Sequence, residues 1–258
     1  MRRFFVFFCA LLSPSVGFSE VNTDSNKEVT IIAEDDWYPY SALLQGETEP
    51  KGLAVDIVRE AYKSVGVKVN LKPMPYARCM TLVETGDEIG CFDTVKEPIN
   101  LEKYIFGNET LFESDIVIYA PISDKSEKIT LKGLEDKKVG VTVGYTYDAE
   151  FTNNKKILQE EARSDLLNFK KLAAGRIDYF VVYDNVGKYI LGQNKKEFSG
   201  KFKVVGKIVT TKLYVNFTRK KPDGQKFLVL LDQGISKIKS NGTYKKLQED
   251  WDKKLTGK

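Results

Sequence analysis

The stretch KPMPYARCMTLVETGDEIGCFDTVKEPINLEKYIF, residues 72–106, decides the fold. An apolar strand ends at Pro73, a short helix begins at Tyr76, and Gly86 ends that helix. Residues 88–92 form the next predicted strand. A strand–helix–strand unit this short makes a right-handed crossover, so we predict two neighbouring parallel strands and an α/β fold.

Several chemically active side chains lie where the second strand ends and the helix begins. Ligands of open α/β sheets bind at this carboxyl edge. The mixture of aromatic, cationic and polar groups suits a small charged solute better than a lipid or a nucleic acid. The residues that we expect to converge on one crevice there are Tyr76, Arg78, Phe92, Asp93 and Thr94.

The rest of the chain repeats the alternation of strands and helices and then returns. This order predicts two α/β lobes joined by two strands, with a ligand cleft between them. Lobe 1 would comprise residues 25–117 plus 208–258, and lobe 2 residues 118–207. The predicted strands are 28–33, 67–71, 114–120, 138–143, 177–183, 203–209 and 213–217, and the predicted helices outside the opening stretch are 53–65, one from about 148, 165–174, 185–191, 225–238 and 243–251.

The N-terminus predicts a cleaved signal peptide over residues 1–19. Arg2 and Arg3 precede an apolar run over residues 4–12, and small residues follow. A buried N-terminal helix would fit poorly with two arginines and a proline, and the run is too short for a permanent membrane anchor. We therefore expect a periplasmic protein. Removing the two arginines lowers the formal net charge from +4 to +2, and no basic stripe marks a nucleic-acid interface.

Cys9 lies in the predicted signal peptide and is lost when that peptide is cleaved. The two cysteines that remain are Cys79 and Cys91. We expect both at the carboxyl edge of neighbouring strands in an oxidising compartment, which predicts a disulfide. Two free buried thiols are the alternative.

Three blocks of the sequence resemble the family-3 periplasmic solute-binding proteins, the amino-acid type that feeds ABC importers. The resemblance runs from about Val29 to the C-terminus. The three blocks are Asp36-Trp37-Tyr38-Pro39-Tyr40 with Gly52 and Asp56, Pro75-Tyr76-Ala77-Arg78 with Gly86-Asp87, and Leu172-Ala173-Ala174-Gly175-Arg176-Ile177-Asp178.

The resemblance implies a two-lobed periplasmic-binding-protein-like fold of type II. It also implies a monomeric protein that captures an amino acid or related carboxylate by hinge closure and delivers it to a membrane permease. Gly144 and Thr146 occupy positions where the family holds the ligand carboxylate, although such a turn can also merely cap a helix. The family's carboxylate-binding arginine is absent, because Asn100 stands near its position. Its role would then pass to Arg78 or Lys96.

Each candidate ligand-binding residue has a plainer alternative role. Arg78 can grip a carboxylate with paired hydrogen bonds, or it can be a surface residue at a helix start. Asp184 can receive an ammonium group, or it can cap the helix that follows. The aromatic residues Trp37, Tyr40 and Tyr76 can form walls of the site or pack in the core. Asp93 and Thr94 can bind the solute or simply end their strand.

Besides solute binding, the sequence leaves two other functions open, that of an enzyme and that of a sensory subunit. The chain has no histidine, which excludes histidine-based triads and histidine metal sites, and we expect no metal, no cofactor and no catalytic residue. Carboxylate chemistry on the same fold, as in cyclohexadienyl dehydratase-like enzymes, stays open through residues such as Glu34 and Asp93. A soluble sensory subunit is the third possibility.

Overall fold

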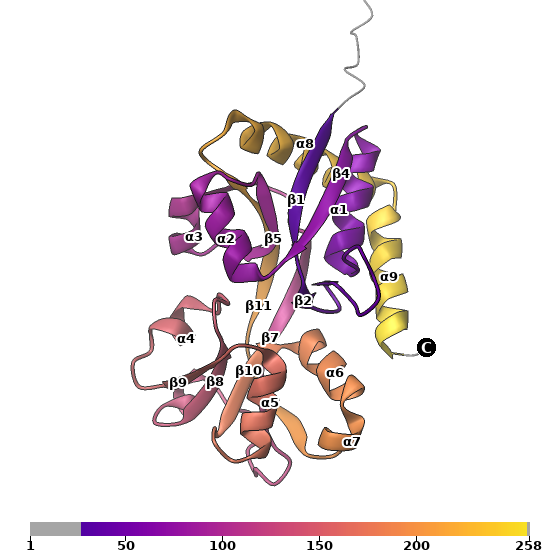
Figure 1. Cartoon of the computed structure of the whole chain (residues 1–258). Coiled ribbons are helices and arrows are strands. Elements are labelled where there is room, and N and C mark those ends of the chain that lie inside the picture. Colours follow the sequence, from indigo (N-terminus) through magenta and orange to yellow (C-terminus); the bar gives the residue numbers. More distant parts are fainter. Residues whose placement is uncertain (1–26, 257–258) are drawn as a thin grey trace, which may run out of the picture.

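The computed structural model describes residues 27–256 of the chain (Figure 1). The predicted signal peptide, residues 1–19, lies outside the described residues. Among the helices within 27–256, none is both long and apolar enough to cross a lipid bilayer.

Lobe 1 is built on three parallel strands, with β1 in the middle. β4 pairs with β1 along its whole length, and β5 pairs with the other edge of β1. The prediction that β4 and β5 are neighbours is therefore wrong, because the fully buried second half of β1 takes the central position. The elements of this part are β1 (Glu28–Glu34), β2 (Asp36–Trp37), β3 (Ser41–Ala42), α1 (Leu53–Ser64), β4 (Lys68–Met74), α2 (Tyr76–Thr85), β5 (Gly90–Val95), α3 (Pro98–Lys103) and β6 (Tyr104–Phe106).

Two long antiparallel strands, β7 (Phe112–Pro121) and β11 (Phe202–Thr218), run from one lobe into the other (Figure 1). The predicted lobe boundaries fall at Val117 and Lys207, which are directly paired in this ladder. Two separate strands were predicted for the return, but β11 is continuous. Shifts of register at Val204–Gly206 and Lys207–Val209 keep it paired with β7 while it bends.

Lobe 2 continues the same sheet on the other side of β7. β10 pairs antiparallel with β7 and parallel with β8, so the strand order is β4-β1-β5-β11-β7-β10-β8-β9. The polar, exposed edge strand β9 was not predicted, because its sequence LQEEA carries no apolar alternation. The elements are η1 (Leu131–Leu134), β8 (Lys138–Thr142), α4 (Ala149–Asn153), β9 (Leu158–Ala162), α5 (Asp165–Ala173), β10 (Tyr179–Tyr183), α6 (Asp184–Gln193) and α7 (Lys195–Phe198).

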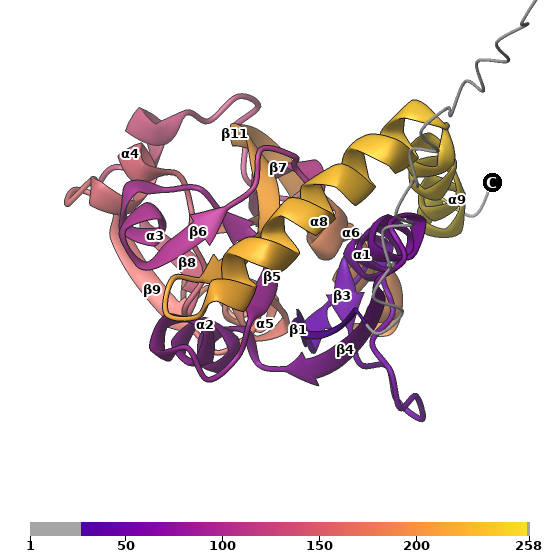
Figure 2. The ribbon, with the colours of Figure 1, turned by 90° about the horizontal axis from the view of Figure 1, so that it is seen from above.

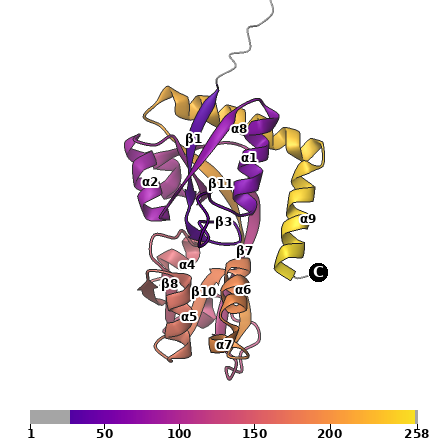
Figure 3. The same cartoon turned by 45° about the vertical axis from the view of Figure 1, so that its right-hand side comes forward.

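The C-terminal helices α8 (Pro222–Ser240) and α9 (Thr243–Thr256) return to lobe 1. α8 crosses over α1, as the view from above shows (Figure 2), and α9 runs along the outside of α1 (Figure 3). Gly234 makes the first crossing close, since a Cβ there would lie 2.2 Å from the Ala61 carbonyl oxygen.

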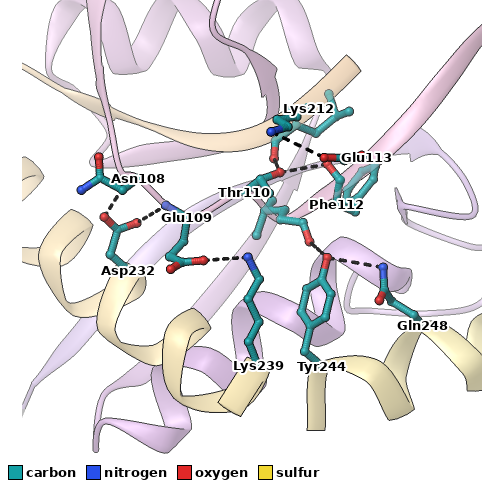
Figure 4. Close-up of polar contacts among 12 residues, drawn as sticks. Asn108, Glu109, Thr110, Phe112, Glu113, Lys212, Asp232, Lys239, Tyr244 and Gln248 are labelled. Carbon is teal, nitrogen blue, oxygen red and sulfur yellow. Dashed lines mark hydrogen bonds and ion pairs between the residues drawn. The ribbon is translucent and has the colours of Figure 1, made fainter. Parts of the chain in front are cut away.

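These two helices also hold the segment that leads into β7 (Figure 4). The carboxylate of Asp232 accepts hydrogen bonds from the backbone N–H groups of Asn108 and Glu109 at 2.7 and 3.1 Å. Lys239 Nζ lies 2.6 Å from Glu109 Oε2, and the Tyr244 hydroxyl donates to the Leu111 carbonyl at 2.6 Å. The lobe 1 end of the crossing strand is therefore fixed to the C-terminal helices.

The predicted disulfide between Cys79 and Cys91 is confirmed, with a Cα–Cα distance of 6.0 Å. It joins α2 to β5, and both cysteines are fully buried. Closing a loop of this size stabilises the fold by about 3 kcal/mol in the chain-entropy account. The expected position of Cys91 at the carboxyl edge is wrong, because it is the second residue of β5, and that strand continues through Asp93 and Thr94 to Val95.

Candidate functional site

A small cavity of about 10 Å³ lies between the lobes, roughly the space for one water molecule. It adjoins a groove of about 700 Å³ that shares Glu34, Tyr76 and Tyr145 with it and also includes Asp36, Ala77, Arg163 and Asp165. The cavity residues come from lobe 1 (Glu34, Trp37, Tyr76, Asp93 and Val95) and from lobe 2 (Tyr145, Thr146 and Tyr183).

Two carboxyl groups, of Glu34 and Asp93, share one wall of the cavity. Ile32 of β1 is paired with Cys91 of β5, and the two acids stand two residues further along their strands. At Asp93 the pairing of β5 with β11 is interrupted, and both acids line the cavity. They are only 5% and 6% exposed. Burial, followed by the charge of Asp93, raises the pKa of Glu34 well above its ordinary value, and burial raises the pKa of Asp93 well above its own.

Asp93 has an unusual backbone conformation and, among the described residues, an unpaired side chain. Its backbone φ is +72°, in the left-handed region that favours glycine, asparagine and aspartate. Neither carboxylate oxygen has a hydrogen-bond partner among the described residues, and the buried Nε1 of Trp37 also has none. Buried polar atoms are nearly always paired in folded proteins. A cavity lined by such atoms is a place for a hydrogen-bonding solute.

Aromatic rings form the other walls and meet nearly at right angles. Trp37 lies 4.8 Å from Tyr183 at 87° and 6.2 Å from Tyr145 at 78°, between ring centroids. Tyr76 and Tyr145 are 6.1 Å apart at 90°. The rings come from both lobes, so the walls are complete only while the lobes are together.

Direct contacts join the lobes around the cavity. The Tyr145 hydroxyl donates to Glu34 Oε1 at 3.0 Å, and Asn185 Nδ2 donates to the Tyr40 hydroxyl at 3.2 Å. Further out, Tyr38 packs against Tyr189 of α6 with 4.2 Å between ring centroids.

A third acid, Asp165, lines the adjoining groove at the start of α5. It is 5% exposed and accepts a hydrogen bond from the Thr142 hydroxyl, while Ser164 caps the helix. Burial is the main cause that raises the pKa of Asp165 to about 7, and the charge of Asp36 adds to it. The groove therefore continues the acidic character of the cavity. Within residues 27–256, no three or more Asp, Glu, His or Cys side chains are grouped so as to hold a metal ion.

Four of the predicted ligand-binding residues, Trp37, Tyr76, Asp93 and Thr146, line the cavity. Three more lie behind it, and line neither the cavity nor the groove. Tyr40 stacks on Phe112 and bonds to Ser114 at 2.8 Å, Phe92 is fully buried in the core, and Thr94 accepts a 3.4 Å hydrogen bond from Tyr76.

The remaining three, Arg78, Gly144 and Asp184, line neither space. Arg78 is exposed on α2, and no hydrogen bond or ion pair of its guanidinium occurs within 27–256. Gly144 is exposed in the turn after β8 with φ +81°. Asp184 is the first residue of α6 rather than its cap, and it pairs with Lys188.

Lys96, which could replace the missing family arginine, and Asn100, which stands near the position of that arginine, both make other contacts. Lys96 donates to the Gly107 carbonyl and lies 4.1 Å from the ring centroid of Tyr214. Asn100 is buried and donates to the Val95 carbonyl at 2.9 Å. Neither side chain lines the cavity.

Sequence reasoning did not select Tyr145, Tyr183 or Asp165 for the site, and it considered Glu34 as an acid that could counter a cation, take part in carboxylate chemistry or be solvated. Glu34 had a signal, because it ends an apolar strand at the same carboxyl edge. Tyr145 stands between the two turn residues that were selected. Asp165 gave no signal apart from a helix start, where acids are common.

Comparison with known proteins places the chain in a family. No curated protein sequence matches it. An ancestral arginine-binding protein bound to arginine has the same fold, with 21% identity, a TM-score of 0.74, and coverage of 88% of this chain and 99% of that chain. A histidine kinase sensor domain with similarity to periplasmic binding proteins matches at 18% identity and TM-score 0.75, over 88% of this chain and 97% of that one.

An amino acid ABC transporter substrate-binding protein from Streptococcus pneumoniae, bound to L-arginine, matches at 16% identity and TM-score 0.72, over 89% of this chain and 96% of that chain. At such identities these structures show the two-lobed fold. The family model covers residues 29–254. The chain therefore belongs to the bacterial extracellular solute-binding proteins, family 3.

Proposed function

We propose that this protein is exported to the periplasm, closes its two lobes on a small polar solute, and delivers the solute as a monomer to the permease of an ABC importer. The observation that carries the proposal is the cavity between the lobes, across which Tyr145 bonds to Glu34. A solute that contacts both lobes gains those contacts only in the closed arrangement, so binding shifts the population toward closure.

Entry of a solute requires the lobes to separate. The cavity of about 10 Å³ is far below the roughly 300–1,000 Å³ of ordinary small-molecule sites. The two crossing strands β7 and β11 are the connection that could bend, and the register shifts of β11 lie at its passage between the lobes.

The residues that we propose to contact the solute are those that line the cavity. Trp37, Tyr76, Asp93 and Thr146 are joined there by Glu34, Tyr145 and Tyr183. Tyr40, Phe92 and Thr94 support them from behind. Arg78, Gly144 and Asp184 are not part of this proposal, because they line neither the cavity nor the groove.

The solved relatives support a solute of amino-acid size. Their names include binding proteins for arginine and a substrate-binding protein of an amino acid ABC transporter. The arginine bound by those proteins carries a cationic group, which is the kind of group that buried acids such as Glu34 and Asp93 would attract.

Two observations favour other functions on the same fold. Carboxyl groups with raised pKa in a cleft, here Glu34, Asp93 and Asp165, are also typical of general acids and bases in enzymes. The structural likeness to a histidine kinase sensor domain favours a sensory role.

Titration calorimetry with a panel of amino acids, amines and small acids separates binding from catalysis. A binding protein gives heat that saturates at one equivalent, and mass spectrometry recovers the solute unchanged. Continuing heat with a chemically altered solute would mean an enzyme. Uptake of the labelled solute by cells with and without this protein then tests delivery, and a sensor would leave uptake unchanged.

A further inference from the structure

We propose that the solute of this site is a small organic cation that carries an amino or guanidino group and no carboxylate. The inference rests on the proposed function, because it names the chemical class of the solute for the same cavity.

The first ground is the charge of the site. Glu34 and Asp93 line the cavity together, and Asp36 and Asp165 line the groove that leads to it. Glu34 is affected by the charges of all three of these acids. A cation on this path stabilises the charged, deprotonated form of these acids, whereas a solute anion would push their already raised pKa values higher. Burial strengthens both effects because the surroundings screen charge poorly.

The second ground is the lack of a positive side chain to receive a carboxylate. Among residues 27–256, no lysine or arginine lines the cavity, and Arg163, exposed just before α5, is the single basic residue that lines the groove. The sequence alternatives Arg78 and Lys96 line neither the cavity nor the groove. A solute carboxylate would thus be buried beside Asp93 and Glu34 without a counter-charge, which is strongly unfavourable.

The third ground is the state of Asp93. Asp93 is only 6% exposed, lines the cavity, and has two acceptor oxygens without a partner within 27–256. An ammonium or guanidinium group supplies several N–H donors, and hydrogen bonds between oppositely charged groups are the strongest that proteins form.

The aromatic walls complete the match. Trp37, Tyr76, Tyr145 and Tyr183 present rings at nearly right angles around the two acids. Faces of aromatic rings attract alkylammonium and guanidinium groups, and they do so most strongly where water is excluded. A carboxylate gains nothing from these faces.

Calorimetry with three matched pairs tests the proposal on the protein without its signal peptide. In each pair the second compound is the first without its carboxylate: arginine and agmatine, lysine and cadaverine, ornithine and putrescine. We expect at least one decarboxylated compound to bind, and about tenfold or more tighter than its amino acid partner.

Variants at the two acids tie the result to the site. Glu34→Gln and Asp93→Asn keep the shape of each side chain and remove its charge, and each is expected to weaken binding of the amine by about tenfold or more. The control is Glu102→Gln, an exposed acid on α3 that lines neither space, and it is expected to leave affinity unchanged. Circular dichroism verifies that each variant is folded.

Three results would overturn the proposal. The first is tighter or equal binding of the amino acid in every pair, which leaves the proposed binding function intact. The second is amine binding that neither acid variant weakens. The third is absence of binding by all three amines, and a wider panel of neutral and anionic solutes then decides separately whether the protein binds a solute at all.

Discussion

The Tyr145 hydroxyl lies 3.0 Å from Oε1 of Glu34 and donates a hydrogen bond to it across the gap between the lobes. Tyr145 follows β8 of lobe 2, and Glu34 is the last residue of β1 in lobe 1. This one contact therefore lines the proposed solute cavity and also joins the two lobes.

Removing this hydrogen bond should favour the open arrangement of the protein without solute. We expect Tyr145→Phe to destabilise the closed state by about 1–3 kcal/mol, the usual cost of leaving a buried polar group without its partner. Small-angle X-ray scattering should then show a larger radius of gyration than for the unmodified protein.

The control for that experiment is Tyr179→Phe. It removes a tyrosine–carboxylate hydrogen bond of 3.1 Å to Asp124, and both residues lie in lobe 2. An identical scattering curve for Tyr145→Phe and the unmodified protein would mean that the contact does not hold the lobes together.

Replacing Asp93 by asparagine should stabilise the protein without solute. The substitution removes a buried carboxyl group without partners, and asparagine tolerates the φ of +72° about as well as aspartate does. We expect the free energy of unfolding in urea near pH 7 to rise by about 1–3 kcal/mol.

Asp136→Asn is the matched control, since Asp136 also has a positive φ, +60°, but is exposed. It should leave the free energy of unfolding unchanged within about 0.5 kcal/mol. A lower stability of Asp93→Asn would contradict the view that the Asp93 carboxyl is kept for its ligand.

Stability should fall as pH rises from about 4 to about 7 because of Asp165. Its pKa is about 7 in the folded protein against 3.8 ordinarily, so between these values the folded state holds a proton that the unfolded state has released. The stabilising contribution of this bound proton to folding is fully present below about pH 4 and is lost as pH approaches 7. One group of this kind gives a slope of up to about 1.4 kcal/mol per pH unit.

The pKa values of Glu34 and Asp93 are also raised, so these two acids add to the slope. The groups that interact with Asp165 are Asp36, Thr142, Tyr145 and Tyr147. Urea unfolding from pH 4 to 8 measures the dependence. In Asp165→Asn the decline should be visibly shallower, and an unchanged pH profile for this variant would exclude Asp165 as a cause.

Arg78→Ala tests the carboxylate clamp that the sequence suggested. Loss of such a clamp would weaken carboxylate binding by about 2 kcal/mol or more. Arg78 is exposed and lines neither the cavity nor the groove. We therefore expect calorimetry to give the variant an affinity for the solute within about twofold of that of the unmodified protein. A loss of tenfold or more would place the guanidinium in the solute site after all.

Much of the fold could be predicted from local patterns. The helical spacing of α1, Gly86 at the end of α2 with its φ of +88°, and the apolar run of β10 each fixed an element within a few residues. The placement of β1 between β4 and β5 could not be predicted from the strand–helix–strand unit alone, because any pair of parallel strands can admit a third between them.

The site was harder to predict than the fold because it depends on register between distant segments. The pairing of Ile32 with Cys91 brings Glu34 beside Asp93, and no local pattern contains that offset. Conversely, Arg78 had the right chemistry at the right edge, but the first turn of α2 directs it to solvent while Tyr76 and Cys79 are buried. Tyr183, at the end of β10, had been read only as part of a buried strand.

The most direct test is the distance between the lobes with and without solute. Spin labels at Glu102→Cys on α3 and Lys196→Cys on α7, two exposed positions in different lobes, allow it to be measured by pulsed electron paramagnetic resonance. With the amine that binds by calorimetry, we predict that a broad distribution of distances narrows to a single short distance, and that Glu34→Gln needs at least about tenfold more amine to narrow it. A distribution that stays the same at saturating amine would contradict closure of the lobes on a solute.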